Sequence, residues 1–290
     1  MSDEKVKDGP VRERIDAPVA CFDGLVLFGT SEGHFIALDT ATGEERWRVQ
    51  LTGPIRGTAN YLAGTPSRVY VIEQPTGVLN CIDPATGAVL WKGEGPERCD
   101  GSPSVSPDAV AFGSCAAAIH VFDPATGRLL RNIKIDGDSQ VAGGVAQDEG
   151  LVFSGCRSGK VLQVDVKEGK LLWANDQSES EVYTTPAVND QWVVAASNDS
   201  NVYGIDRADG RGKWKFDTKG SPTSPVIAGD KVVVAADGEL FLLRLADGTK
   251  VWSLKISDEI TAPAVAGDMI LVGSEDGTVV ALGAPKTKEP

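Results

Sequence analysis

A motif of eleven residues recurs about every 40 residues along most of this chain. An apolar residue ends a short apolar segment, Asp follows two positions later, Gly four positions after that, and Trp four positions after the Gly, as in ALDTATGEERW. A period of this length is typical of architectures in which each repeat is one supersecondary unit that stacks on its neighbours. The copies are residues 37–47, 81–91, 121–131, 163–173, 204–214 and 242–252, with a truncated seventh at 281–283.

Each repeat predicts four short strands and no helix. In the sixth repeat the strands are separated by the turns Gly229-Asp230, Asp237-Gly238 and Ala246-Asp247-Gly248, and no segment shows helical spacing of apolar residues. One four-stranded sheet cannot bury both of its faces, so the copies must stack, and radial stacking avoids long free edges. The sequence therefore predicts an all-β fold, a seven-bladed β-propeller of four-stranded antiparallel blades. Its third strands are expected at 34–39, 78–83, 118–123, 160–165, 201–206, 239–244 and 278–283.

The two ends of the chain raise the question of how the ring closes. Residues 13–285 are predicted to form a single propeller domain and residues 286–290 a C-terminal tail. The last blade has no outer strand of its own after Gly283. Residues 1–12 are an N-terminal extension, and Val6 to Glu13 is long enough for a short strand. We expect this extension to complete the seventh blade, with Pro10 tolerated on an edge strand.

The repeat resembles a known family. The pattern Ala-x-Asp-x-x-x-Gly-x-x-x-Trp, met in full by Ala37, Asp39, Gly43 and Trp47, is similar to the tryptophan-docking repeat of the pyrroloquinoline-quinone-type propellers. The resemblance covers nearly the whole chain. It implies that each Trp leaves the outermost strand and packs across the interface between blades, and that the Gly permits the preceding turn. The structural docking residues are then Trp47, Trp91, Trp173, Trp214 and Trp252, and Arg131 replaces the third Trp.

Composition excludes several classes of partner. The chain of 290 residues has 28 basic and 41 acidic side chains, so its formal charge is 28 − 41 = −13, and no run of five or six basic residues occurs. Binding to a nucleic-acid backbone needs clustered Lys and Arg, so nucleic acid is not an expected partner. The longest apolar segments are strand-sized, shorter than the roughly 20 residues of a membrane helix, so no membrane span is expected.

Residue types that would form a catalytic or metal site are sparse. The only histidines, His34 and His120, belong to non-adjacent repeats and cannot share a metal ion. No nucleophile elbow, phosphate-binding loop or dinucleotide fingerprint is present. The recurrent Asp residues occur once per repeat, ahead of the Gly, where a carboxylate accepts backbone N–H bonds and stabilises the turn. No catalytic residue and no metal site are predicted.

The resemblance leaves more than one function open. Its family includes quinone-dependent dehydrogenases, which would bring pyrroloquinoline quinone (PQQ) with calcium as cofactors. This chain is barely long enough for its blades and has no inserted loops to cover a reacting centre. The resemblance is closer to the non-catalytic propellers that act as assembly or docking platforms, so we expect a monomeric scaffold with a protein partner and no cofactor. The alternatives are a quinone-dependent dehydrogenase-like or sugar-binding propeller, or a sensory domain of a larger receptor.

A binding surface is expected where the repeats differ from one another. Residues just before the innermost strands, and the loops between second and third strands, should open on one face at the mouth of the channel. Their polar and aromatic side chains do not repeat, as expected of a binding surface on a rigid ring, although a solvated rim is the alternative. The candidate residues are Arg14, Asp16, Arg56, Arg98, Asp100, Gln140, Arg157, Tyr183, Thr184 and Glu259.

Five cysteines leave the cellular compartment open. In the third repeat, pairing across the turn near Pro107 brings Cys99 and Cys115 within one residue of register, and a bulge would permit a disulfide between them. Cys156 is a rival partner, and two free thiols are the alternative. The N-terminal residues lack the apolar core of a secretory signal. We expect a periplasmic or extracytoplasmic protein whose signal lies outside this sequence, with the cytoplasm as the alternative.

Overall fold

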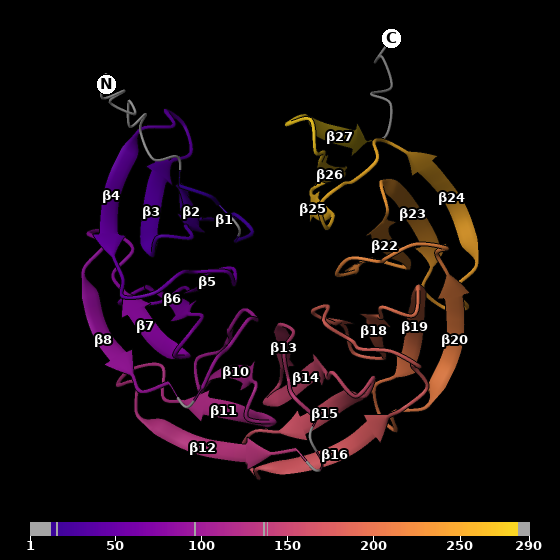
Figure 1. The fold of residues 1–290 in the computed structure, drawn as a ribbon, viewed down its shortest axis with the longest axis horizontal. Helices are drawn as coiled ribbons and strands as arrows, with labels where there is room; N and C mark the ends of the chain where they lie inside the picture. The colour runs from indigo at the N-terminus through magenta and orange to yellow at the C-terminus, as the bar shows by residue number, and fades with distance from the viewer. Residues whose placement is uncertain (1–12, 16, 96, 136, 138, 284–290) are drawn as a thin grey trace, which may run out of the picture.

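Seven antiparallel sheets stand radially around a central axis in the computed structural model (Figure 1). The structure describes residues 13–15, 17–95, 97–135, 137 and 139–283. Within these ranges the regular structure consists of strands alone, so none of the described segments is a helix that could cross a membrane. The predicted all-β, seven-bladed propeller is confirmed.

Six blades have four described strands and the seventh has three. The first four blades are formed by β1 (Ala20–Phe22), β2 (Leu25–Gly29), β3 (His34–Asp39) and β4 (Glu45–Gln50); β5 (Asn60–Leu62), β6 (Arg68–Glu73), β7 (Val78–Ile82) and β8 (Val89–Gly93); β9 (Ser104–Val105), β10 (Val110–Ser114), β11 (Ala118–Phe122) and β12 (Leu129–Lys134); and β13 (Val145–Asp148), β14 (Leu151–Gly155), β15 (Val161–Asp165) and β16 (Lys170–Asn175). The last three are formed by β17 (Ala187–Val188), β18 (Trp192–Ala196), β19 (Asn201–Asp206) and β20 (Gly212–Asp217); β21 (Val226–Ala228), β22 (Lys231–Ala236), β23 (Glu239–Arg244) and β24 (Lys250–Lys255); and β25 (Ala264–Ala266), β26 (Met269–Gly273) and β27 (Val279–Gly283).

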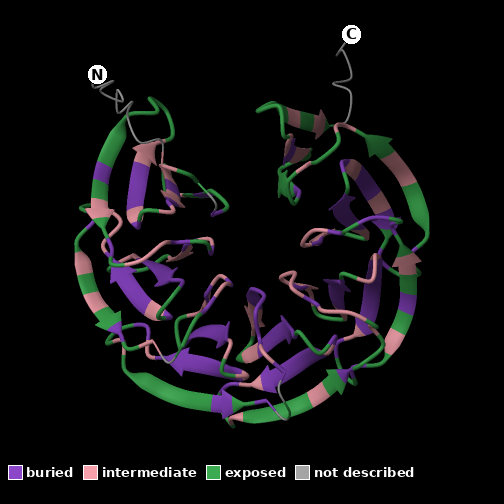
Figure 2. Ribbon diagram, in the orientation of Figure 1, coloured by how far each residue is buried: buried purple, intermediate pink, exposed green. Residues whose placement is uncertain are grey.

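The core lies between the blades rather than within any one of them. In the second to sixth blades the second and third strands are mostly buried, whereas the fourth strands are largely exposed (Figure 2). The strands β26 and β27 of the seventh blade are mostly intermediate or exposed. Buried apolar side chains form six clusters, and each cluster joins two consecutive blades, from the first and second to the sixth and seventh. Because the sheets of the second to sixth blades bury both faces against their neighbours, their strands are apolar in runs rather than strictly alternating. This stacking supplies the burial that an isolated 40-residue repeat lacks.

In the part of the chain that the structure describes, the strands of the first and the seventh blade are separated by an opening (Figure 1). A cavity of about 560 Å³ lies at this opening, with walls from Ile15 and Val19 on one side and Leu271 and Val279 on the other. Val279 is 73% exposed and Ile15 is 54% exposed. In the described part of the chain, β27 pairs only with β26. The closing strand expected from residues 1–12 lies outside the described residues.

His120 is enclosed in the third blade. Its Nε2 lies 2.7 Å from the Ser114 hydroxyl, and its ring packs against Phe112 with the centroids 5.5 Å apart. The side chain is fully buried, and Nδ1 has no hydrogen-bond partner in the described structure. Burial lowers the pKa of His120 to about 4. In the charged imidazolium both ring nitrogens carry a proton, and the proton at Nδ1 would have no acceptor among the described residues.

This imidazole predicts a loss of stability in mild acid. Between pH 6.5 and about pH 4 this histidine binds a proton in the unfolded chain, where its pKa is near 6.5, but not in the folded chain. The contribution of neutral His120 to the stability of the folded chain is therefore complete above pH 6.5 and is lost toward pH 4. We expect His120 to account for about 2 kcal/mol of the stability lost between pH 7 and pH 5. Urea unfolding of the wild type and of His120→Gln at both pH values measures this difference. Parallel pH dependence of the two proteins would contradict it.

Candidate functional site

The repeat aspartates stabilise the turn between the third and fourth strands. Asp39 Oδ1 accepts hydrogen bonds from the backbone N–H of Ala41 at 2.9 Å and of Thr42 at 3.0 Å, and the Gly43 N–H donates to the Asp39 carbonyl at 2.9 Å. The bond from Thr42 is the main reason that the pKa of Asp39 is lowered. In the part of the chain that the structure describes, no three His, Cys, Asp or Glu side chains gather as metal ligands. These carboxylates are therefore turn caps.

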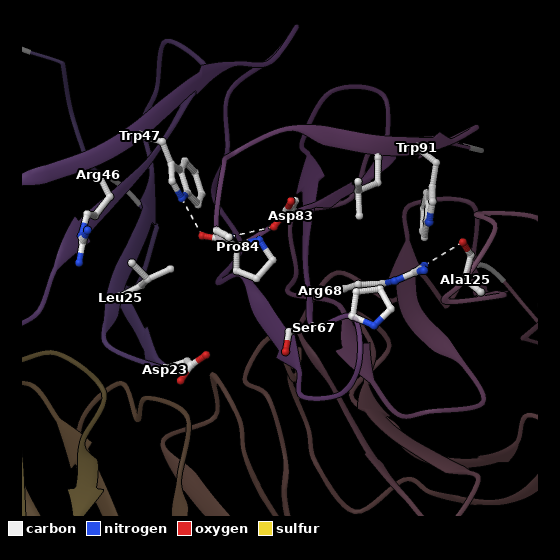
Figure 3. Close-up of a pocket in the computed structure, with 13 residues that line it drawn as sticks. Asp23, Leu25, Arg46, Trp47, Ser67, Arg68, Asp83, Pro84, Trp91 and Ala125 are labelled. Carbon is white, nitrogen blue, oxygen red and sulfur yellow. Dashed lines mark hydrogen bonds between the residues drawn. The ribbon is translucent and has the colours of Figure 1, made fainter.

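Each docked tryptophan lies on the turn of the following blade. Trp47 Nε1 donates to the Pro84 carbonyl at 2.8 Å (Figure 3), and a Cβ on Gly87 would lie 2.8 Å from the indole. The turn glycines Gly43 and Gly87 have positive φ angles of 72° and 75°, which favour glycine. At Gly87 a side chain would also collide with the Trp47 ring, so glycine is required there for both reasons. Trp173 and Trp214 make the corresponding hydrogen bonds, to Arg207 at 2.9 Å and to Leu245 at 2.7 Å.

Trp91 and Trp252 depart from this arrangement. The Pro124 carbonyl, which corresponds to the acceptor of Trp47, already accepts bonds from Arg68 Nη1 at 2.8 Å and from the Tyr70 hydroxyl at 2.9 Å. The Trp91 Nε1 is consequently buried without a partner in the described structure. Trp252 packs into the apolar cluster between the sixth and seventh blades.

A β-bulge sets the direction of the docking side chain. In each four-stranded blade the register between the third and fourth strands shifts directly beside the docking position. In the first blade Ala37 pairs with Trp47 and Leu38 pairs with Glu45, so Arg46 is the extra residue. A bulge increases local twist and re-aims side chains. The strand pattern alone did not predict this shift.

A cavity of about 750 Å³ lies where the first three blades meet (Figure 3). The indoles of Trp47 and Trp91 form part of its wall, together with Pro84 and Arg68. Its lining comes from turns between first and second strands, from turns between third and fourth strands, and from strand residues such as Trp47 on β4 and Trp91 on β8. In an up-and-down sheet these turns lie on the face opposite the predicted channel mouth.

A backbone hydrogen bond recurs between the loops and the entry segments that carry the predicted mouth residues. In six blades, an N–H of the loop between the second and third strands donates to a carbonyl of the segment that enters the same blade. The bonds are Ser31 N to Arg14 O at 2.9 Å, Gln74 N to Pro54 O at 2.9 Å, Cys115 N to Arg98 O at 3.0 Å, Arg157 N to Gln140 O at 2.9 Å, Asn198 N to Glu181 O at 2.9 Å and Glu275 N to Glu259 O at 3.3 Å. Loops and entry segments are thus held together around the mouth.

The mouth side chains form two separate groups, and the contacts are within each group. Arg98 Nε lies 3.0 Å from Asp100 Oδ1, and Gln74 Nε2 donates to the same carboxylate oxygen. Hydrogen bonding to Asp100 is the main reason that the pKa of Arg98 is raised. The second group joins the fourth and fifth blades: the Arg157 guanidinium lies over the ring of Tyr183, 5.5 Å from its centroid. The sequence indicated these four charged and aromatic residues but not the contribution of Gln74.

The remaining candidate residues belong to neither of these two groups. Arg14, Arg56 and Glu259 are exposed, and Asp16 lies outside the described residues. The Thr184 hydroxyl donates to the Ala196 carbonyl at 2.7 Å within its own blade, so it is already used by the fold. The structure therefore brings together two clusters of the predicted set, not one continuous site.

Small residues line the channel wall, as the convergence of the innermost strands requires. A Cβ on Gly57 would lie 2.6 Å from the Gly101 carbonyl oxygen. Gly101 in turn abuts the backbone of Gly143, and Gly143 abuts the backbone of Tyr183. The entry segments of four consecutive blades therefore touch through backbone contacts at the channel.

The disulfide between Cys99 and Cys115 is not formed: all five cysteines are free thiols. The predicted pairing across the turn is right at Ser104, which faces Ala111, but it does not continue to Cys99. The segment before β9 leaves the sheet, Cys99 becomes fully buried beside Gly101, and only the backbone of Cys115 is joined to this segment, through Arg98.

Thiol reactivity should follow burial. Burial raises the pKa of Cys81 to about 11 and of Cys99 and Cys156 to about 12. The thiolate is the reactive form, so these three cysteines should resist alkylation in the native protein, whereas the exposed Cys21 should react first. Mass spectrometry after iodoacetamide treatment, native and then in urea without reductant, should show five modified thiols only after unfolding. A pair that stays unmodified in urea would indicate a disulfide.

The fold is shared with solved propellers. The crystal structure of BamB from Moraxella catarrhalis superposes with a TM-score of 0.79 at 22% identity, covering 92% of this chain and 84% of that chain. The computationally designed Ika8 protein superposes with a TM-score of 0.63 at 21% identity, covering 93% and 96%.

Curated relatives carry one name. The outer membrane protein assembly factor BamB of Burkholderia pseudomallei is 29% identical over 256 residues, which cover 80% of this chain and 64% of the relative. The BamB of Moranella endobia is 24% identical over 253 residues, which cover 79% of this chain and 61% of the relative. The chain thus spans less than two thirds of the length of these relatives.

The family model described as outer membrane protein assembly factor BamB matches in three overlapping stretches, residues 3–142, 118–262 and 225–289. These stretches cover almost the whole chain and follow the repeats identified above. The chain belongs to the BamB family of propellers.

Proposed function

We propose that this propeller is a non-catalytic scaffold that binds a protein partner through its channel-mouth face and works in the assembly of outer membrane proteins. The family match and the name of the curated relatives support the assembly role. The same names support an extracytoplasmic location, which we propose to be the periplasm. The proposed scaffold is a monomer and uses neither PQQ nor calcium.

The observation that carries this proposal is the stacked pair of Arg157 and Tyr183. Both side chains stand at the mouth, and the guanidinium lies 5.5 Å from the ring centroid. The backbone bond from Arg157 to Gln140 holds the loop in place. Arg and Tyr are enriched among the residues that dominate protein interfaces, and a rigid aromatic loses little conformational entropy on binding. Pre-positioned in this way, the pair is suited to anchor a partner.

Charge adds specificity to this face. Arg14, Arg56, Arg98 and Arg157 stand among the mouth residues of a chain whose formal charge is −13. Asp100 offsets Arg98 locally. The same segments and loops also carry Asp100, Glu181, Glu259 and Glu275, so charges of both signs stand at this face. Charges of both signs can fix the orientation of a partner whose own charges are complementary. We therefore propose a partner whose contact surface carries complementary charges.

The mouth can be tested by charge reversal. Arg157→Glu combined with Tyr183→Ala should weaken partner binding at least about tenfold, because a truncated central anchor typically costs 2 kcal/mol or more. The measurement is the level of folded outer membrane proteins in a deletion strain that carries each variant. A photo-cross-linking residue at position 183 should also capture a partner.

The matched control is Lys170→Glu on the outer strand β16, where the lysine side chain is 71% exposed. Lys170→Glu changes the charge by the same amount as Arg157→Glu, but it lies on an outer strand away from the mouth. It should therefore behave as the wild type. Full complementation by the double variant, with its fold intact by circular dichroism, would refute the proposed face.

A further inference from the structure

The seventh blade has an open edge beside an uncovered face. Among the described strands, β27 pairs only with β26 (Figure 1). Val280 and Leu282 of β27 pack into the cluster shared with the sixth blade, whereas Val279, which alternation places on the opposite side of the strand, is 73% exposed. The edge thus presents backbone N–H and C=O groups next to an apolar side chain, which is the arrangement that accepts an added strand.

The cavity of about 560 Å³ at this opening has no charged side chain among its described lining residues. Ile15 and Val19 form its wall on the first blade, and each is 54% exposed. Among these lining residues Thr261 has the only polar side chain, and its hydroxyl accepts from the Gly273 N–H at 3.0 Å and donates to the Ala262 carbonyl at 3.2 Å. Because that hydroxyl is already paired, the cavity suits an apolar side chain.

The turn between the third and fourth strands of the first blade has no docked side chain. In the turns at Gly87, Gly210 and Gly248, an indole atom of the preceding blade lies 2.6–2.8 Å from the position that a Cβ would take. At Gly43 no described atom lies within 4 Å of that position. The turn is nevertheless formed, with a φ of 72° at Gly43 and a bond of 2.9 Å from its N–H to the Asp39 carbonyl. A ring that docks there has to come from the fourth strand of the preceding blade.

The N-terminal residues of this chain supply no such ring. Docking residues stand ten to twelve residues before the small residue at which the next blade begins, as Trp47 does before Gly57. Counted back from Ala17, this spacing falls on residues 5–7, whose sequence is Lys-Val-Lys. Residues 1–12 contain no aromatic side chain, and six of them are charged. A fourth strand made from this segment closes the edge but leaves the docking turn and the apolar cavity poorly filled.

We propose that this edge binds a transmembrane β-strand of an unfolded outer membrane protein. The incoming strand pairs with β27, places an apolar side chain in the cavity and docks an aromatic ring on the turn at Gly43. Strands of outer membrane barrels alternate apolar with polar residues and carry aromatic girdles, which is the side-chain pattern that these features require. The choice of this substrate class rests on the proposed role in outer membrane protein assembly, whereas the edge, the cavity and the turn are features of the chain itself.

The N-terminal segment and the substrate strand compete for the same edge. Without substrate, residues 1–12 protect β27 from pairing with other chains. A substrate strand makes the same backbone bonds and additionally buries apolar and aromatic side chains that the N-terminal segment lacks. Strand exchange is therefore favourable for an apolar, aromatic strand and unfavourable for a polar one.

The test is a titration of the intact ¹⁵N-labelled protein with a synthetic peptide of about ten residues, the length of a membrane-spanning β-strand. The peptide alternates valine with threonine and contains one tryptophan, and the control peptide has alanine in place of the tryptophan. We expect saturable amide shifts along β27 and in residues 39–43. The alanine peptide should bind at least about tenfold more weakly.

Two substitutions at exposed positions locate the site. Val279→Lys places a charge in the cavity wall, and Gly43→Asn places a side chain where the ring docks, in a residue type that tolerates positive φ. Each should weaken peptide binding at least about tenfold. Gly229→Asn is the matched control, because this turn glycine of the sixth blade has a φ of 59° and no described atom within 4 Å of the added Cβ. It should bind the peptide as the wild type does.

Competition is measured with Val6→Asp, which keeps the full chain and places a charge at one of the few apolar positions of the N-terminal segment. A weaker hold of the segment on the edge raises the fraction of binding-competent protein, so the peptide should bind at least about threefold more tightly.

The absence of saturable shifts at β27 in both the wild type and Val6→Asp would overturn the proposal, and so would affinity that is unchanged in both Val279→Lys and Gly43→Asn. Dimerisation that the peptide does not reverse, measured by analytical ultracentrifugation, would assign the edge to a second copy and also overturn it. Arg157→Glu combined with Tyr183→Ala should bind the peptide as the wild type does. Failure of this site and failure of the proposed mouth function are therefore separate results.

Discussion

Replacing Trp214 by alanine is expected to lower the free energy of unfolding by about 3 to 5 kcal/mol, the range for large-to-small changes at buried aromatic positions. The indole is only 9% exposed, packs in the cluster between the fifth and sixth blades, and lies against Gly248. Its Nε1 bond to Leu245 would also be lost. Urea unfolding followed by circular dichroism measures the change.

Trp91→Ala provides the internal comparison. Trp91 is half-buried and its Nε1 has no hydrogen-bond partner in the described structure, so its removal also relieves an unpaired buried donor. We expect Trp91→Ala to cost less than Trp214→Ala. A cost below about 1 kcal/mol for Trp214→Ala would mean that the indole does not hold the two blades together.

Deleting residues 1–12 should also lower stability by several kcal/mol. We propose that this segment supplies the fourth strand of the seventh blade, where β27 has a single strand partner in the described part of the chain. A free sheet edge next to the exposed Val279 and Met269 is unfavourable in water, and burying one aliphatic side chain contributes about 1.5 to 3 kcal/mol. The melting temperature and the urea midpoint of the truncated protein measure the effect.

The control is deletion of residues 286–290, which removes a polar segment that we expect to be a tail. This truncation should leave the melting temperature close to that of the full chain. If deleting residues 1–12 has an equally small effect, the extension does not close the blade.

The blades could be predicted from sequence because their signals are local. The third strand of the sixth blade spans Glu239–Arg244 and the second spans Lys231–Ala236, as the apolar runs and the Gly turns between them indicated. Asp39 forms the expected turn with residues two to four positions away. Such contacts depend on neighbours along the chain, and the same pattern of strands and turns recurs in six copies of the motif.

The candidate site was predictable only in part. The position of Arg98 and Gln140 just before innermost strands predicted them at the mouth, and the recurrent backbone bond joins both residues to loops between second and third strands. It did not predict which of them touch. The contact of Gln74 with Asp100 and the stacking of Arg157 on Tyr183 join segments 26 residues apart, and their geometry depends on how neighbouring loops pack.

The sequence by itself determined the repeat, the strands, the number of blades and the slot left without a tryptophan at Arg131. The tertiary structure decided what each repeat does with the same pattern. Arg68 and Tyr70 donate to the carbonyl that corresponds to the acceptor of Trp47, so the Trp91 indole N–H has no partner among the described residues. Cys99 leaves the strand that would have aligned it with Cys115. The physical reason is that strand periodicity is set by neighbours in the chain, whereas competition for one acceptor and the path of a segment between sheets depend on residues that meet only when the blades stack.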